Sequence, residues 1–193
     1  LFIFLLYFLS INISYSIEAD VFVQSTVNRA SSILSDNSSK DQKIAELKKI
    51  AKETVDIEGI GFYTLGSIRK QLNDEQKKKY SELFEQYFLK SFSSRLAEYT
   101  NPEIDVFNKE VLSENYTIVN SLLKGTNDRP EVKIDWRIYT KNSQNPLIRD
   151  LIIEGLSLAR TQKEEFTSIL NSNNNDINAL FKSLKEFSQN SSN

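Results

Sequence analysis

The side chains that carry most familiar enzyme chemistry are missing from this sequence of 193 residues. It contains no His, no Cys and no Met. Without His and Cys it lacks the ligands of zinc and thiolate metal sites, and it lacks the nucleophile–base pairs of Ser-His-Asp and Cys-His catalysis. Disulfide bonds and a Cys-linked bacterial lipid anchor are excluded for the same reason. Acid–base catalysis by paired carboxylates is the main chemistry left.

Paired carboxylates are present, but the sequence pattern places them on solvated surfaces. Glu164 and Glu165 lie in a predicted helix, and Glu103 and Asp105 lie beside a predicted turn. Two carboxylates act as acid and base only when a cleft holds them at a fixed separation. The sequence predicts no such cleft, so we expect that the protein is not an enzyme. A hydrolase that uses carboxylates alone is kept as the third hypothesis.

Two further stretches resemble ligand sites only in composition. Gly59, Gly61 and Gly66 follow a predicted helix instead of a strand and lack the spacing of a dinucleotide-binding loop, so they indicate a turn. Residues 171–178 lack the sixth-position glycine of a calcium loop, and Lys182 occupies the twelfth position, where a Glu is needed. We therefore expect neither a metal nor a cofactor.

Composition and charge limit the classes of partner. The formal net charge is −2 and 39% of the residues are hydrophobic, which predicts a folded core and argues against a dedicated nucleic-acid binder. The length suits one domain. Lys77, Lys78 and Lys79 are interpreted as the solvated face of a helix; an electrostatic patch for a partner or an anionic membrane surface is the alternative.

The start of the chain has the pattern of a targeting signal. Residues 1–9 (LFIFLLYFL) form an unbroken apolar run, and more polar residues follow as far as Ala19. A helix that spans a bilayer needs about 20 apolar residues, which is roughly twice this run. We expect residues 1–19 to be a secretory signal peptide, truncated at its start and cleaved before Asp20, and residues 20–193 to be one exported domain. A short membrane anchor is the alternative.

Helical periodicity governs the residues up to about 100. Apolar residues recur at helical spacing in residues 20–34 and between Ile44 and Val55, and residues 56–66 predict a turn that enters a short helix. The longest predicted helix begins after Asn73, because Gln76 completes a capping box with it. Its buried face carries an unusually aromatic stripe: Tyr80, Leu83, Phe84, Tyr87, Phe88, Phe92 and Leu96.

Alternating patterns predict strands between residues 104 and 154. In residues 132–138 every second residue is apolar, and in residues 114–123 we assign Tyr116, Ile118 and Leu122 to the apolar face. Residues 147–153 predict a short apolar strand, and two helices follow Gly155. This order predicts an α+β fold in which a twisted antiparallel sheet of three to four strands is wrapped by N-terminal and C-terminal helices.

With these segments in order, the chain resembles a known family. Three blocks carry the likeness: residues 55–66 (VDIEGIGFYTLG), residues 72–99 (LNDEQKKKYSELFEQYFLKSFSSRLAEY), and residues 149–158 (RDLIIEGLSL) followed by Lys163 and Phe166. An aromatic–Arg pair, Trp136-Arg137, precedes the third block. The blocks resemble those of the MlaC family of periplasmic phospholipid-binding proteins, also called toluene-tolerance auxiliary proteins, over about residues 20–187.

The resemblance implies a fold and a function. The sheet and helices would enclose a deep apolar pocket that holds the acyl chains of a phospholipid while the head group faces solvent. The phospholipid would be cargo and not a cofactor. The protein would be a soluble periplasmic carrier between an outer-membrane MlaA-like lipoprotein complex and an inner-membrane ABC transporter with its MlaD-like substrate-binding subunit.

The inward faces and the architecture of the family together predict which side chains line the pocket. We expect the lipid to contact Phe62, Leu65, Phe88, Phe92, Tyr116, Ile118, Val132, Ile134, Trp136, Ile138, Leu151 and Ile153. Asp150, Glu154 and Gly155 are assigned to the corner between the last strand and the helix that follows. The second hypothesis is an exported, non-enzymatic interaction module with a solid core, because an ordinary core and a lipid pocket have the same sequence pattern.

Overall fold

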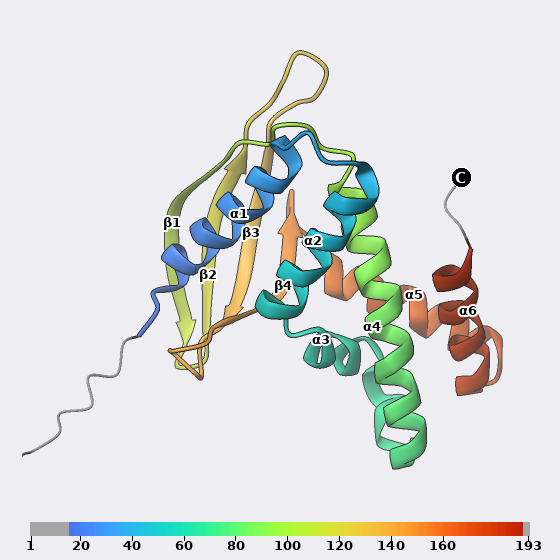
Figure 1. The fold of residues 1–193 in the computed structure, drawn as a ribbon. Coiled ribbons are helices and arrows are strands. Elements are labelled where there is room, and N and C mark those ends of the chain that lie inside the picture. The colour runs from blue at the N-terminus through green and yellow to red at the C-terminus, as the bar shows by residue number, and fades with distance from the viewer. Residues whose placement is uncertain (1–15, 191–193) are drawn as a thin grey trace, which may run out of the picture.

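The elements follow one another in the predicted order, with helices first, an antiparallel sheet next and helices last (Figure 1). The computed structural model describes residues 16–190. Most of the predicted signal peptide lies outside these residues, so the signal peptide and its cleavage stay predictions. Within residues 16–190, no helix has both the length and the apolar character needed to cross a membrane.

Residues 16–100 form four α-helices and a short 3-10 helix. Capping boxes begin two of them, since Ser39 and Gln42 exchange hydrogen bonds at the start of α2, and Asn73 and Gln76 do so at the start of α4. The elements are α1 (Ala19–Ser35), α2 (Lys40–Thr54), α3 (Ile57–Thr64), η1 (Gly66–Lys70) and α4 (Asp74–Leu96).

The sheet has five strands, one more than the upper number predicted. Its order is β1-β2-β3-β4-β5 and all neighbours are antiparallel, with irregularities in β1 near Phe107 and Leu112. The fifth strand has only two residues, which is too short for an alternating pattern to reveal it. The strands are β1 (Ile104–Ser113), β2 (Tyr116–Leu123), β3 (Val132–Tyr139), β4 (Leu147–Ile153) and β5 (Leu156–Ser157).

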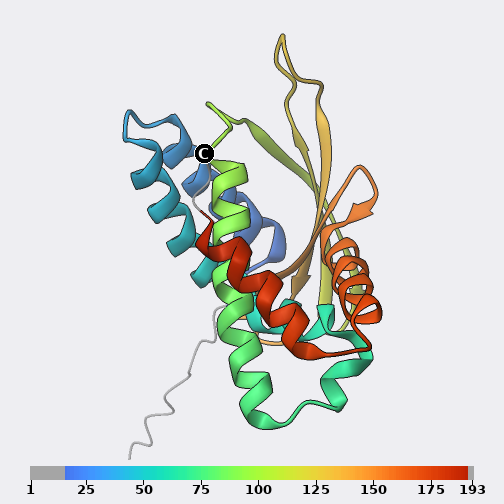
Figure 2. The ribbon, with the colours of Figure 1, turned by 90° about the vertical axis from the view of Figure 1, so that its right-hand side faces the viewer.

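Helices lie on both sides of the sheet. Figure 2 shows α1, α2 and α4 on one side, which we call the inner face, and α5 (Leu158–Ser172) on the other. α1 contacts β1 and β2, whereas α5 contacts β4. The last helix, α6 (Ile177–Gln189), packs on α4 and α5. Phe166 of α5 meets Phe84 of α4 edge-on, with ring centroids 6.2 Å apart, so α5 also joins the helical core.

The predicted inward face of β2 is wrong. Val119 lies opposite Trp136 and is fully buried, and Thr117 and Ser121 flank it on the same inner face. Tyr116, Ile118 and Leu122 therefore lie on the outer face. Both sets contain residues suited to strands, so alternation alone does not decide which face is buried.

A buried carboxylate fixes the corner between β4 and α5, as predicted. Asp150 accepts hydrogen bonds from the Ser157 hydroxyl (2.6 Å) and from the backbone N–H of Ala159 (3.0 Å). Glu154 and Gly155 form the turn with φ of 50° and 82°, a left-handed conformation that glycine adopts without strain. Asp150 thus holds the first turn of α5 against β4.

Close approach between α3 and α4 requires a glycine. A Cβ atom at Gly61 would lie 2.8 Å from Cδ1 of Phe84. Beside this contact, the Tyr80 hydroxyl lies 2.8 Å from the Thr64 hydroxyl and donates to the Gly61 carbonyl at 3.1 Å. α4 therefore rests directly on the backbone of α3.

Asp150→Asn should lower the free energy of unfolding by about 2 kcal/mol, because the NH2 group that replaces one carboxylate oxygen cannot accept the hydrogen bond made to that oxygen. Urea unfolding measures the change. Asp128→Asn, at an exposed loop position, is the matched control and should change stability by less than about 0.5 kcal/mol. Equal stability of the two variants would contradict the role given to Asp150.

Gly61→Ala should destabilise the protein by about 1–3 kcal/mol, although alanine favours a helix more than glycine does. The reason is the clash with the Phe84 ring. In a Phe84→Leu background the same substitution should cost less, because the smaller, non-planar leucine side chain can change rotamer and move away from the new methyl group. A double-mutant cycle from urea unfolding tests this coupling, and strict additivity would refute it.

Candidate functional site

The aromatic stripe of α4 provides one wall of the candidate site. Phe84, Phe88 and Phe92 are four residues apart, so they lie above one another on one side of the helix. The Phe84 and Phe88 rings are 6.1 Å apart, and the Phe88 and Phe92 rings stack at 5.6 Å with an interplanar angle of 10°. Phe84 is buried, but Phe88 and Phe92 are only half-buried. The stripe becomes more accessible toward the C-terminal end of α4.

The inner face of the sheet provides a second apolar surface, which belongs to the same core cluster as the α4 stripe. Ile134, Trp136 and Ile138 are buried along β3. The indole N–H of Trp136 donates to the Ser121 hydroxyl (2.8 Å), which donates to the carbonyl of Ile134 (3.0 Å). The polar groups of this wall therefore satisfy each other and leave an apolar face.

Large apolar side chains that pack on this core remain partly exposed. A fully buried side chain of this kind contributes about 1.5–3 kcal/mol relative to an exposed one, so the partly exposed ones leave part of that gain unused. A ligand with an apolar body can supply the missing contacts. The half-buried residues that pack on the core are Phe22, Ile57, Phe62, Leu83, Tyr87, Phe88, Phe92, Ile104, Val106, Leu123, Val132, Leu151 and Ile169.

Most of the predicted lining residues come together in this region. Leu65, Ile134, Trp136 and Ile138 are buried in the core. Half-buried against it are Phe62, Phe88, Phe92, Val132 and Leu151. Ile153 is half-buried and pairs with Ile134.

Tyr116 and Ile118 lie apart from the other predicted residues, on the outer face of the sheet. The sequence reasoning missed Phe22, Leu123 and the β1 residues Ile104 and Val106, which are half-buried against the core. The pairing of Ile104 with Leu123 and of Leu123 with Val132 places these three on the inner face. No sequence signal revealed them, because their faces depend on strand register. The lipid contacts themselves stay a prediction.

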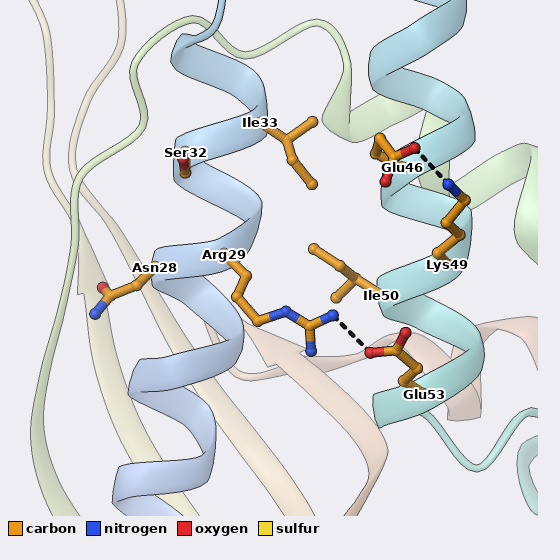
Figure 3. A pocket seen from close by; sticks show the side chains of 8 residues that line it. All are labelled: Asn28, Arg29, Ser32, Ile33, Glu46, Lys49, Ile50 and Glu53. Carbon is orange, nitrogen blue, oxygen red and sulfur yellow. Dashed lines mark hydrogen bonds and ion pairs between the residues drawn. The ribbon is translucent and has the colours of Figure 1, made fainter.

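A groove of 530 Å³ separates α1 from α2 (Figure 3). Ile33 and Ile50 face one another across it, and an ion pair from Arg29 to Glu53 (2.5 Å) spans it. Both charged side chains are about half-exposed, so the pair contributes at most about 1 kcal/mol. None of the predicted lipid-lining residues borders this groove. A neighbouring hollow of 460 Å³ is lined by polar residues of α1 and by residues 101–103.

A third hollow, of 360 Å³, lies at the outer face of the sheet between α3 and the start of α5; we call it the arginine hollow. Arg149 donates through Nε to Asp56 and through a terminal nitrogen to the Tyr116 hydroxyl (3.2 Å), and it stacks on Tyr139 at 4.3 Å. The lining residues are Gly59, Ile60, Tyr63, Leu112, Ser113, Tyr116, Arg137, Arg149, Asp150 and Ala159.

Two tyrosines and one aspartate have pKa values away from their usual range, and the structure shows the cause of each shift. Burial raises the pKa of the Tyr80 hydroxyl far above its usual range, and burial likewise raises the pKa of Tyr87. A hydrogen bond from Lys109 lowers the pKa of Asp20 at the start of α1. Within residues 16–190, no group of acidic side chains is arranged to hold a metal ion.

Comparisons with known proteins agree with this geometry. The profile of the MlaC protein family matches residues 24–186. The fold is similar to that of a phospholipid-binding protein from Ralstonia solanacearum solved in complex with a phospholipid, with a TM-score of 0.75 and 17% identity over 89% of this chain and 97% of that one. No individually curated protein matches the sequence. Because the family profile spans most of the sequence, the chain belongs to the MlaC family.

Proposed function

We propose that this protein is a periplasmic phospholipid carrier that holds acyl chains between α4 and the inner face of the sheet. The observation that carries the proposal is the set of large apolar side chains left half-buried on both walls. Membership of the MlaC family and the fold shared with a phospholipid-binding protein support it. The head group would remain in solvent at the accessible end of the aromatic stripe.

Energetics favour a carrier without catalytic groups. Burial of each methylene contributes about 0.8 kcal/mol, so two long acyl chains gain roughly 20 kcal/mol relative to water. Source and destination membranes bury the same methylenes, so the net free energy of transfer is small. Exchange then needs only a partner that aligns the site with a membrane-embedded protein. We infer a non-enzymatic shuttle between an outer-membrane MlaA-like complex and an inner-membrane ABC transporter with an MlaD-like subunit.

Organic extraction and mass spectrometry of the purified protein should recover about one phospholipid per chain. Leu151→Arg should reduce this amount at least fivefold, because a guanidinium beside Trp136 costs several kcal/mol when an acyl chain excludes water from it. Incubation with phosphatidylethanolamine vesicles before extraction tests loading directly.

Val111→Arg is the matched control for Leu151→Arg. Val111 is 72% exposed on β1, so this variant should keep the lipid content of the unchanged protein. Circular dichroism establishes that both variants are folded. Equal lipid content in the two variants, or an unchanged protein that carries and accepts no lipid, would contradict the proposal and favour an interaction module with a solid core.

Removal of the lipid should lower the melting temperature, because a ligand that binds only the folded state stabilises that state. Scanning calorimetry before and after delipidation measures the shift, and reloading with phosphatidylethanolamine should restore it. A melting temperature that does not respond to lipid removal is the result expected of a solid core.

A further inference from the structure

Arg137 stands out among the charged residues of the sheet. It lies on the outer face of β3, between Ile118 of β2 and Asp150 of β4, and its side chain enters the lining of the arginine hollow. The side chain is 42% exposed. It is therefore on the side of the sheet opposite the proposed lipid site.

The guanidinium of Arg137 has unused hydrogen-bonding capacity. An Arg side chain offers five N–H donors, yet among residues 16–190 Arg137 has only an ion-pair contact to Asp150, at 3.7 Å. The two oxygens of Asp150 already accept shorter hydrogen bonds from Ser157 and Ala159. Arg149, in the same hollow, is bonded to Asp56 and Tyr116. Arg137 is thus the cation of this hollow that is free to bind an anion.

The walls beside Arg137 are apolar and accessible. Tyr63 of α3 and Leu112 of β1 are 43% and 49% exposed, and both line the hollow. The charge of Arg149 is balanced by Asp56, and the charge of Asp150 is stabilised at the start of α5. The donors that Arg137 leaves unused therefore suit one monovalent anion that is attached to an apolar group.

We propose that the arginine hollow is a docking point for a carboxylate of a partner polypeptide. The carboxylate pairs with Arg137, and an adjacent apolar side chain of the partner packs on Tyr63 and Leu112. Planar guanidinium groups bind carboxylates through two parallel hydrogen bonds. Attraction to an anionic membrane usually needs a cluster of four to eight basic residues, whereas Arg137 has Asp150 beside it and Glu110 in the same row of the sheet. A polypeptide is therefore the favoured occupant.

NMR titration of the isotope-labelled, lipid-loaded protein tests this docking point. The probes are N-acetyl-leucine, its uncharged amide N-acetyl-leucinamide, and dibutyl phosphate, which is a monovalent phosphodiester with apolar groups. N-acetyl-leucine should shift the Arg137 side-chain N–H signal and the amide signals of Gly59 and Ala159, with a Kd of about 10 mM or tighter, as expected of a small fragment. The amide should bind at least fivefold more weakly.

Arg137→Gln should abolish the response to N-acetyl-leucine. Arg129→Gln is the matched control, because Arg129 lies in the β2–β3 loop over Tyr99 and does not line the hollow; it should respond like the unchanged protein. A well-dispersed spectrum establishes that each variant is folded. Retained binding in Arg137→Gln, equal binding of acid and amide, or no binding of the acid would overturn the proposal. Tighter binding of dibutyl phosphate would overturn it in favour of a lipid head group.

Discussion

Incomplete burial of apolar surface is the constraint on which this structure depends. α4 rests closely on α3 at Gly61, but its later aromatic residues, Phe88 and Phe92, are not fully covered by the chain itself. The same holds for Leu151 on β4. A protein selected only for stability would be more stable if these side chains were fully packed against the rest of the core. In the proposed function, this accessible apolar surface would offer acyl chains the contacts that the chain leaves unmade.

The two faces of the sheet differ in chemical character, with an apolar inner face and charged side chains on the outer face. On the inner face, the polar atoms of Trp136 and Ser121 are bonded to one another or to the backbone. On the outer face, Arg149 forms an ion pair with Asp56, whereas Arg137 has N–H donors that no hydrogen bond uses among residues 16–190. Because alternate residues of each strand face opposite sides, neighbouring residues of β3 place Trp136 on the inner face and Arg137 on the outer face. The proposed docking point and the proposed lipid site therefore lie on opposite faces of the sheet.

The sequence predicted where the helices and strands lie better than it predicted which face of a strand is buried. The capping box at Asn73 and the clean alternation of β3 depend on local pattern, and both are present. β2 has plausible strand residues on both faces, so only its pairing with β3 shows that Val119 is inside and Ile118 outside. The bond from Arg149 to Asp56 joins residues far apart in the chain. Periodicity carries no information on such a contact.

Whether the apolar walls stand apart is also beyond sequence pattern, since Phe88 and Leu151 would be apolar in a filled core or in a lipid site. An experimental electron-density map of the protein purified with its natural ligands tests this most directly. The account predicts continuous, elongated density between α4 and β4, in contact with Phe88, Phe92 and Leu151. Direct packing of these side chains against one another, with no space for an alkyl chain, would contradict it.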